Sequence, residues 1–328
     1  MTTMQDVARH AGTSAAVVSY VLNNGPRPVS AETREKVLRA VDELGYRINS
    51  AGRTLRSRKS KILGLIVPDS SHPFFADISR RIERSTYDLG YVVLIGNTLA
   101  DPVREREYFE LFREHQVDGV ILTIDPEDRA ATLIEAGIPV VLLDERSAEL
   151  DAALSSVSVD NFQAAFDATT SLIAEGHSSI GFIGGNPGLP SADSRFEGWK
   201  AALDNAGMNA DRSRRVEFSR QAGYEVAFEF LEDRENAPTA MFVSSDQQAV
   251  GLLRACGELG VAVPRELSVI SFDDSDDALY TTPPLTTVRQ PIDLLIDRAL
   301  QILLDPPAQP VHERYPHEIV RRASTIHH

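Results

Sequence analysis

The chain contains 328 residues, of which 42% are hydrophobic and 25% are charged, a composition typical of globular proteins. This length allows two or three domains with substantial cores. The longest apolar runs, such as Tyr91–Ile95, are far too short to cross a membrane, and no secretory signal pattern opens the sequence. The only cysteine, Cys256, excludes an internal disulfide framework. We therefore expect a cytoplasmic protein without a membrane segment.

The net charge of −15 is distributed unevenly along the chain. Residues 1–61 carry 11 Lys and Arg against 5 Asp and Glu, a net charge of +6, whereas the remaining residues carry 22 against 43, a net charge of −21. A basic module joined to an acidic body is typical of a phosphate-binding domain attached to a domain with another role. A solvated basic face is the plainer alternative.

Residues 3–23 predict two short helices joined by a turn. The first has an apolar stripe at helical spacing, formed by Met4, Val7, Ala8 and Ala11. Gly12 can end this helix in the left-handed region, and Ser14 can cap the next one. The outward side of the second helix would carry Ala15, Ala16, Ser19 and Tyr20. The pattern fits a helix-turn-helix or an ordinary helical hairpin, and the local basic charge favours the helix-turn-helix.

A third helix is expected between Ser30, its cap, and Gly45, its stop, which completes a headpiece over residues 1–47. Residues 48–60 form a basic segment in which Asn49 can cap one short helix. Two helical turns are unstable alone, so this segment either stays a linker or folds on a partner. Leu55 is its one large apolar side chain, which suits insertion between base steps in the minor groove of DNA.

From residue 61 onward, strand and helix patterns alternate, which predicts parallel sheets covered by helices. Strands are expected at residues 62–67, 91–95, 119–122, 139–143, 180–183, 215–218, 240–243 and 267–272. Helices are expected at residues 74–89, 105–115, 130–136, 162–174, 196–205, 224–231 and 247–259. Two successive sets predict two doubly wound lobes with a ligand cleft between them. The expected fold class is an all-α helix-turn-helix headpiece followed by an α/β core of two such lobes.

These segments resemble the lactose/galactose repressor (LacI/GalR) family of transcriptional regulators over essentially the whole chain. The resemblance is carried by QDVARHAGTSAAVVSYVLN, NSAGRTLRS, ILGLIVPDSSHPFFADISRRIE, GHSSIGFIGG, SRFEGWKAAL, SSDQQAVGLLRA and LSVISFDDSDDALYTTPPLTTVRQP. It implies a core over residues 61–328 that is similar to periplasmic sugar-binding proteins. The chain would cross between the lobes near Asp160, Val288–Gln290 and Ile319. Lobe 1 would then combine about 61–160 with 290–319, and lobe 2 about 161–289 with 320–328.

The resemblance also implies which residues contact DNA. Base edges would be reached by three residues of the recognition helix: Ala15, Ala16 and Tyr20. Contacts to the phosphate backbone would come from four residues: Ser14, Ser19, Asn23 and Thr33. Asn49 would begin a hinge helix, and Leu55 would intercalate at the operator centre.

Three departures from the family pattern matter for DNA recognition. Many members have Arg in place of Tyr20, and an Arg would read guanine with two hydrogen bonds. Alanines make only apolar contacts, such as those with thymine methyl groups. Ile48 replaces the usual proline and Gly52 replaces an alanine, so the hinge should depend more strongly on DNA for its folding.

In the cleft, the resemblance implies effector contacts by Phe74, Arg195, Phe218, Asp246 and Asp273, with Asp69, Asp144 and Ser191 as further candidates. Carboxylates accept hydrogen bonds from hydroxyl groups, arginine donates, and aromatic rings cover the apolar face of a sugar. Three of these candidates have a plainer interpretation. Asp246 can be a helix N-cap, at least one of Phe74 and Phe75 can belong to the core, and Asp273 or Asp274 can cap a short helix.

We therefore expect a repressor that binds a pseudo-palindromic operator as a homodimer and is released by a sugar-like effector. A purine-like corepressor that tightens operator binding, or a sugar-binding protein without DNA function, are the alternatives. An acidic pair in a cleft also suggests glycoside hydrolysis, which requires an acid of raised pKa. The sequence has no Ser-His-Asp order, metal-spaced histidine cluster or phosphate-binding loop, so we expect neither an enzyme nor a bound metal or cofactor.

Overall fold

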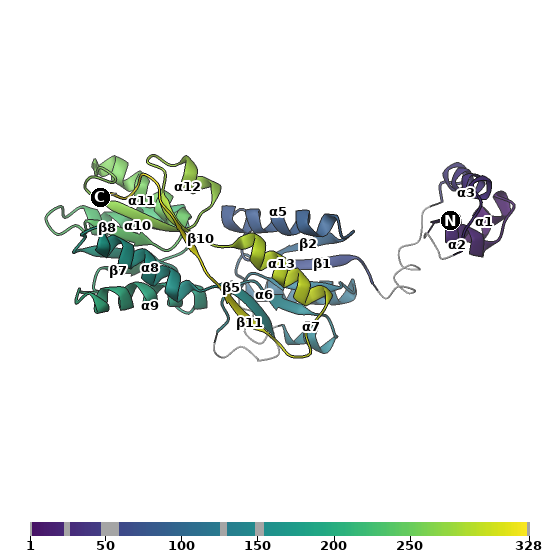
Figure 1. Ribbon diagram of the computed structural model, residues 1–328, viewed down its shortest axis with the longest axis horizontal. Coiled ribbons are helices and arrows are strands. Elements are labelled where there is room, and N and C mark those ends of the chain that lie inside the picture. The colour runs from purple at the N-terminus through teal and green to yellow at the C-terminus, as the bar shows by residue number, and fades with distance from the viewer. Residues whose placement is uncertain (1, 23–26, 47–58, 125–129, 148–153, 327–328) are drawn as a thin grey trace. The chain divides into compact units, whose positions relative to one another are not determined.

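Figure 1 shows the computed structural model of the chain. It describes residues 2–22, 27–46, 59–124, 130–147 and 154–326. The chain divides into two compact units, Met1–Ser60 and Lys61–His328, each of which is described by itself. None of the helices in the described ranges is long and apolar enough to cross a membrane.

The first unit is a small three-helix headpiece. Its helices are α1 (Met4–His10), α2 (Ala15–Leu22) and α3 (Ala31–Glu43). As predicted, Gly12 and Gly45 follow α1 and α3 with φ values of +61° and +56°, a backbone region that favours glycine. A reciprocal cap that the sequence reading missed joins Thr3 and Asp6 at the start of α1.

The headpiece core is minimal. It consists of the buried side chains Val7, Ala8, Val18, Val21, Val37 and Ala40. Because so few apolar groups hold the three helices together, pairs at the ends of the helices add support, among them His10 Nε2 and Glu43 Oε2, 2.7 Å apart. This arrangement leaves one side of α2 free to face a partner.

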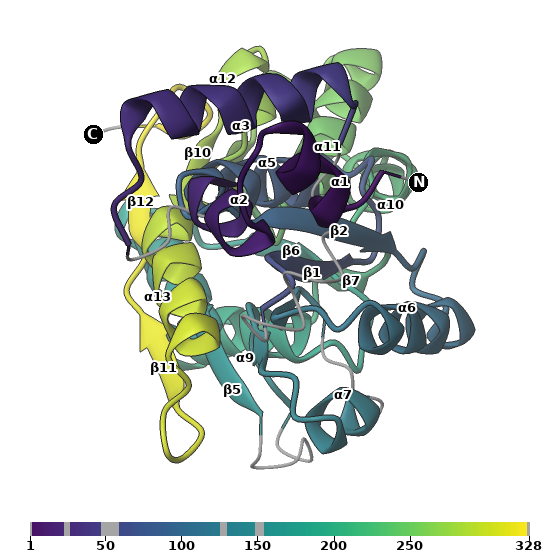
Figure 2. The ribbon, with the colours of Figure 1, turned by 90° about the vertical axis from the view of Figure 1, so that its right-hand side faces the viewer.

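The first lobe of the second unit is a parallel sheet. Its strands are β1 (Ile62–Val67), β2 (Val92–Asn97), β3 (Gly119–Leu122), β4 (Val140–Leu142), β5 (Ser155–Val159) and β11 (His312–Tyr315), in the order β11-β5-β4-β3-β1-β2. Its helices are α5 (Pro73–Tyr87), α6 (Pro102–Glu114), α7 (Ala131–Glu135) and α13 (Ile292–Leu304). Apolar residues of α5 and α13 pack on one face of the sheet and those of α6 and α7 on the other. Figure 2 shows α13 beside β5, with β11 at the sheet edge.

The second lobe repeats this design. Its strands are β6 (Ile180–Gly184), β7 (Ser213–Arg215), β8 (Ala240–Val243), β9 (Ser268–Asp273), β10 (Thr286–Arg289) and β12 (Glu318–Val320), in the order β12-β10-β9-β8-β6-β7. All neighbours are parallel except β10 and β12. Its helices are α8 (Asn161–Ala174), α9 (Pro190–Asn205), α10 (Arg220–Leu231), α11 (Asp246–Leu259) and α12 (Asp276–Tyr280). Helices α8 and α9 cover one face, and α10 and α11 the other.

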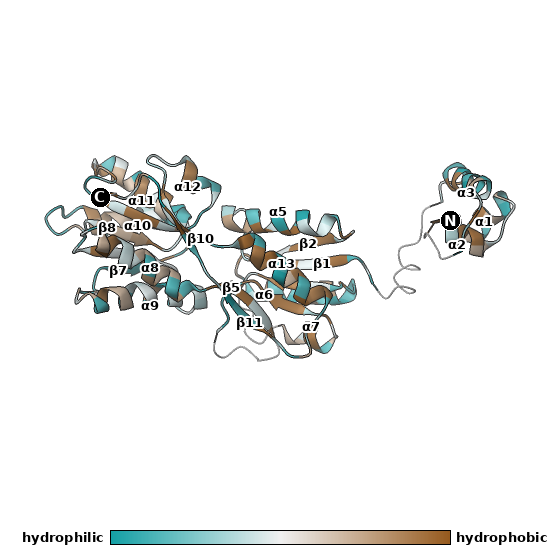
Figure 3. Ribbon diagram, in the orientation of Figure 1, coloured by the Kyte–Doolittle hydropathy of each residue, from teal (hydrophilic) through white to brown (hydrophobic). Residues whose placement is uncertain are grey.

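The central strands of both sheets, such as β1 and β8, are strongly apolar and fully or almost fully buried, and β1 is brown in Figure 3. Their burial drives the formation of the two cores, because apolar area removed from water stabilises by roughly 25 cal/mol per Å². The expected fold class, a helical headpiece and two doubly wound lobes, is confirmed.

The chain passes between the two sheets three times: from β5 to α8, from β10 to α13 and from β11 to β12. The first two passages lie where the sequence placed them. The third lies before Glu318, because Ile319 already pairs with Val288 in the second sheet. Each passage brings polar residues to the space between the lobes.

Two strand predictions differ from the structure. Strand β5 was not anticipated, because its sequence SSVSV is rich in serine although all five residues are buried. The strand expected at residues 215–218 lies at Ser213–Arg215, which leaves Phe218 in the loop before α10. The elements after residue 273 were also not delimited by the sequence pattern.

Candidate functional site

The exposed side of α2 is the candidate DNA-reading surface. Val18 and Val21 are buried, as predicted, whereas Ala16 is exposed and Tyr20 is half-buried. Ala15 is also half-buried and packs partly against the headpiece core. The surface is thus small and mostly apolar, with the Tyr20 ring as its largest group.

The helix starts of the headpiece carry the candidate backbone-contacting residues. The Ser14 hydroxyl accepts a hydrogen bond from the Val17 amide at 3.3 Å, which caps α2 as expected. Ser30 caps α3, and its hydroxyl donates to Thr33 Oγ1 at 2.9 Å. Ser19 is half-buried on the same side of α2 as Tyr20. Asn23, Asn49 and Leu55 lie outside the described residues.

Arg195 is the central cation of the inter-lobe site. Helix α9 begins at Pro190, not at Phe196 as the sequence suggested, so Arg195 lies inside the helix instead of before it. The expected start was too late because Leu189, the residue at the cap position, makes no side-chain cap and the preceding Asn-Pro-Gly-Leu-Pro stretch is typical of a loop. Ser191 lies in the first turn of the same helix.

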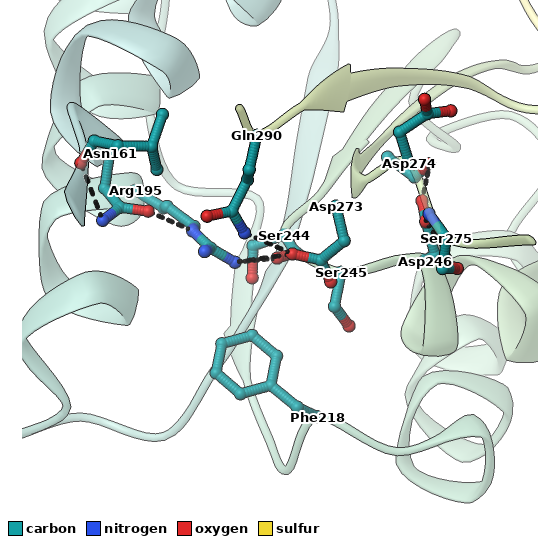
Figure 4. A network of polar contacts seen from close by, with 12 residues as sticks. Asn161, Arg195, Phe218, Ser244, Ser245, Asp246, Asp273, Asp274, Ser275 and Gln290 are labelled. Atoms are coloured by element: carbon teal, nitrogen blue, oxygen red, sulfur yellow. Dashed lines mark hydrogen bonds and ion pairs between the residues drawn. The ribbon is translucent and has the colours of Figure 1, made fainter. Parts of the chain in front are cut away.

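The guanidinium of Arg195 is buried and bound to three protein acceptors. Its Nε donates to Asn161 Oδ1 at 2.8 Å, and its Nη1 donates to the carbonyl of Ser244 at 2.6 Å. Nη1 also lies 3.9 Å from Asp273 Oδ1 (Figure 4). The group stacks over the Phe272 ring at 3.7 Å, a favourable cation–π geometry. Burial lowers the pKa of Arg195, and nearby carboxylates, Asp273 first, oppose this shift.

Asp273 faces Arg195 from the last residue of β9. Its φ value of +112° is strained for a residue with a side chain, and such strain is typical of functional sites. Gln290, at the second passage between lobes, donates from Nε2 to Asp273 Oδ1 at 2.9 Å. Burial raises the pKa of Asp273 to about 8, against the opposing effect of Arg195. The carboxyl is thus positioned at the lobe junction and is not the cap of a helix, since Ser275 precedes α12.

Asp246 is held by protein groups on both of its oxygens. Oδ1 accepts hydrogen bonds from the hydroxyls of Ser271 and Thr287, and Oδ2 accepts from the amide and hydroxyl of Ser275. Burial raises its pKa to about 6. The alternative of an N-cap is wrong, because Ser245 caps α11. With its acceptor positions occupied, Asp246 fixes the loop that follows Asp273 (Figure 4).

Asp144 and Glu145 follow β4 and reach across to the start of α9. Asp144 accepts from the Ser191 hydroxyl, and burial raises its pKa to about 7. Glu145 Oε1 accepts from the Ser194 hydroxyl at 2.9 Å, and its Oε2 accepts from Asn161 Nδ2 at 3.0 Å. The first lobe therefore contacts α9 of the second lobe through two adjacent carboxyl groups.

Phe74 and Phe218 approach the same region from opposite lobes. Phe74, in the first turn of α5, is half-buried against the first-lobe core and also lines a cavity of about 400 Å³ together with Asp273 and Gln290. The Phe218 ring lies 5.9 Å from the Arg195 guanidinium, and its carbonyl accepts from His72 Nε2 at 3.1 Å. The site thus has an apolar wall on each side of the Arg195–Asp273 pair.

Several site residues were not anticipated from the sequence. They are Glu145, Asn161, Ser194, Ser244, Gln248 and Gln290. Gln248 donates to the carbonyls of Gly184, Val216 and Glu217, and so holds the loop that carries Phe218. A signal that could have found one of them is a polar residue directly after an apolar strand, the position that Ser244 occupies after β8.

The described residues contain no group of three or more His, Cys, Asp or Glu side chains that could hold a metal ion. Burial raises the pKa of the Cys256 thiol to about 12, so this cysteine is a core residue and a poor nucleophile. The chemistry that the inter-lobe site offers is hydrogen bonding by carboxyl groups beside a buried cation.

The sequence and fold resemble those of known bacterial regulators. Residues 3–49 match the model of the bacterial regulatory proteins of the lacI family, and residues 169–325 match that of the periplasmic binding protein-like domain. The repressor CytR of Escherichia coli K12 is 37% identical over 307 residues, which cover 92% of this chain and 89% of CytR. The chain belongs to the lacI family of bacterial regulatory proteins.

Solved structures agree with the assignment of this chain to the lacI family. The lac repressor dimer bound to operator and the anti-inducer ONPF matches with a TM-score of 0.86 and 29% identity, over 99% of each chain. The complex of the regulator CelR with cellobiose matches with a TM-score of 0.73 and 27% identity, over 99% of this chain and 100% of CelR. The lacI-family regulator is thus a DNA-binding transcriptional regulator with a headpiece and an effector-binding core, as the sequence predicted.

Proposed function

We propose that this regulator represses transcription by binding a pseudo-palindromic operator as a homodimer, and that a sugar-like effector in the inter-lobe site releases it. The observation that carries the proposal is the buried Arg195–Asp273 pair, which Asn161 and Gln290 hold at two of the three passages between lobes. A ligand that contacts this pair binds beside the segments that connect the two lobes, so its binding can change the angle between the lobes. It shifts the equilibrium between lobe arrangements only by the difference in its affinity for them.

The effector is proposed to be an uncharged, hydroxyl-rich molecule. Asp144, Asp246 and Asp273 surround a single buried arginine, and Arg195 already donates to protein acceptors. Arg81 and Arg289, which line the cavity, are paired with Asp293 at 2.7 Å and Asp274 at 2.6 Å. Hydroxyl groups supply donors for the carboxyl groups, whereas a phosphate group adds like charge. Phe74 and Phe218 would cover the apolar faces of the ring.

The proposed homodimer would use apolar side chains on the side of the second unit that carries β2 and α12. Val92 on the edge strand β2 is 62% exposed, and Tyr280 at the end of α12 is 82% exposed. Figure 1 shows α12 at the top of the second lobe and β2 as the uppermost strand of the first sheet, beneath α5. Exposed apolar groups of this kind mark interaction surfaces. A two-fold symmetric protein would match the two half-sites of an operator.

The proposal places the regulator in the cytoplasm, with DNA and effector as its partners, and gives the inter-lobe site a binding role without catalysis. Hydrolysis of a glycoside requires one carboxyl as acid and another as base or nucleophile beside the substrate. Asp246 is occupied by four protein donors, and Asp144 by the Ser191 hydroxyl and the Glu145 amide. These contacts leave neither carboxyl free to act as an acid or a nucleophile, and give both a structural role around Arg195.

The test measures operator binding by the full chain, first on a library of random duplexes to find the site, then with a panel of neutral sugars. A sugar that raises the thermal midpoint and weakens operator binding supports the proposal. A sugar or purine that tightens operator binding supports the corepressor alternative instead. Binding to duplex DNA that is absent, or that does not weaken with salt, would favour a sugar-binding protein without DNA function, because phosphate contacts release counterions.

A further inference from the structure

The carboxyl group of Glu145 accepts hydrogen bonds from three different elements, α8, α9 and β11. From its place after β4, its Oε1 accepts from Ser194 of α9 at 2.9 Å and from Nη2 of Arg314 in β11 at 3.1 Å. Its Oε2 accepts from Asn161 Nδ2, at the start of α8. The side chain is only 8% exposed, so the carboxyl is shielded from solvent and its contacts are made inside the protein.

The Asn161 side-chain amide bridges Glu145 and Arg195 by hydrogen bonds. Its Nδ2 donates to Glu145, while its Oδ1 accepts from Arg195 Nε at 2.8 Å. A carboxylate can only accept and a guanidinium can only donate, so the amide has one favourable orientation between them. Glu145 thereby determines which atom of Asn161 faces the arginine.

A continuous series of polar contacts results, and it reaches all three passages between the lobes. Its members in order are Arg314, Glu145, Asn161, Arg195, Asp273 and Gln290. Arg314 lies just before the third passage, Asn161 directly after the first, and Gln290 at the second. Figure 4 shows the part of the series from Asn161 to Gln290. The effector-site residues occupy its centre.

We propose that Glu145 is a positioning residue that couples the effector site to the lobe angle, by fixing the Asn161 amide against Arg195 and by holding Arg314 beside the third passage. The proposal rests on the proposed function for the identity of the effector site. The charge of Glu145 acts on Arg195, but its hydrogen bonds go to Ser194, Arg314 and Asn161, so it orients the Arg195 guanidinium through Asn161. Energetic coupling requires such an element with two arrangements that both sites influence.

The main test compares Glu145→Gln with Glu313→Gln in the full chain. Glu313 is the matched control, because it is paired with Arg298 in the same lobe, on the same strand as Arg314, but outside the series. The measured quantity is the ratio of operator Kd with a saturating neutral sugar to that without it. We expect Glu145→Gln to lower this ratio at least about fivefold, the lower end of typical allosteric couplings, while the sugar still raises the thermal midpoint. Glu313→Gln should leave the ratio unchanged.

Two further variants separate coupling from general damage. Asn161→Ala should weaken sugar binding, since Arg195 loses its oriented partner. Arg314→Met should reduce the ratio without changing the sugar affinity, because it cuts only the contact near the third passage. An unchanged ratio in Glu145→Gln, or an equal loss in Glu313→Gln, overturns the proposal.

A second measurement needs no effector and so distinguishes failure of this proposal from failure of the proposed function. Hydrogen exchange of the ligand-free chain should rise in Glu145→Gln both at residues 314–318 and at residues 289–295 near the second passage, which the series reaches only through Asn161, Arg195 and Asp273, and should not rise at both places in Glu313→Gln. If no sugar binds but exchange rises at both places, the coupling stands and the effector class is wrong. If exchange rises only next to residue 145, Glu145 is a local structural residue and the proposal fails.

Discussion

A Cβ atom on Gly198 would lie only 2.2 Å from the carbonyl oxygen of Phe162, so only a glycine allows α8 and α9 to pack this closely. Phe162 directly follows Asn161, and Gly198 lies three residues after Arg195. The close packing of the two helices therefore fixes the 2.8 Å contact between Asn161 and Arg195. The geometry of the proposed effector site thus depends on Gly198, a residue with no side chain to offer a ligand.

Gly198→Ala should accordingly disturb the site from a distance. A methyl group at this position must push backbone atoms apart, and overpacking of this kind costs about 1–3 kcal/mol. We expect a lower free energy of unfolding in urea and weaker binding of the sugar. Gly257→Ala in α11 is the control, because nothing lies within 4 Å of its Cβ position. It should be neutral or stabilise by up to about 1 kcal/mol. Equal behaviour of the two variants would contradict the close-packing argument.

The stability of the core should depend on pH through Asp273. Its folded pKa of about 8 lies above the ordinary aspartate pKa of 3.8, so between these values the folded state holds a proton that the unfolded state has released. This contribution to the free energy of unfolding is therefore fully present below about pH 4 and falls as the pH rises from about 4 to about 8. Asp273→Asn should make the decline less steep, as measured by urea denaturation at a series of pH values. The exposed Asp297→Asn should leave the slope as it is, and the same slope in all three proteins would refute the assignment.

Charge on the ligand should decide its affinity. A neutral sugar and its phosphate ester form a matched pair, and we expect the ester to bind at least about tenfold more weakly, or about 1.4 kcal/mol, because the carboxylates Asp274 and Asp293 at the cavity repel it and already neutralise the arginines there. Isothermal calorimetry on the full chain measures both. Tighter binding of the ester would show that the arginines lining the cavity, such as Arg289, leave their carboxylate partners to bind it.

Base recognition should change when the Tyr20 ring is replaced. Tyr20→Arg introduces a side chain that can bind guanine with two hydrogen bonds, a difference of roughly 1–3 kcal/mol between bases at one position of each half-site. Selection from a randomised operator library measures the preference of each protein. The fold of the headpiece should be retained, since Tyr20 is not part of the buried core. An identical base profile would remove Tyr20 from the reading surface.

Association of two chains should be sensitive to Tyr280. A charge at this exposed apolar position would be buried without a partner in the proposed dimer, so Tyr280→Asp should weaken the dimer by about 2 kcal/mol or more. Sedimentation equilibrium measures the effect. Leu111→Glu, at an exposed apolar position on α6, serves as the control and should leave the dimer intact. Dissociation by the Leu111 variant alone would move the interface to the other face of the lobe.

The sequence predicted the architecture well because hydrophobic periodicity reports burial directly. It placed α3 between Ser30 and Gly45, and the family resemblance pointed to Arg195 and Asp273, which lie 3.9 Å apart in the structure. It did not reveal the roles of Asn161 and Gln290, because the contacts that give those amides a role join residues 34 and 17 positions apart, respectively. Strand β5 was missed because its serines are satisfied by pairing that only the folded sheet provides.

The start of α9 is a local feature that the sequence also failed to predict. A cap made by a side chain leaves a signature in the sequence, whereas α9 begins at a proline after a leucine that makes no side-chain cap. The loop-like residues before Pro190 concealed a helix that tertiary packing stabilises. Local propensity is a weak guide where packing decides.

The three passages between lobes also determine the order in which the core can form during synthesis. Both lobes contain strands from distant parts of the chain: β11 pairs with β5, and β12 pairs with β10. When a ribosome has produced the first 285 residues, the first sheet still lacks β11 and α13, and the second lacks β10 and β12. Neither lobe can therefore be completed before the other has largely emerged. The two lobes must therefore complete their folding together. A fragment that lacks the residues after 285 would leave two incomplete sheets with exposed edges.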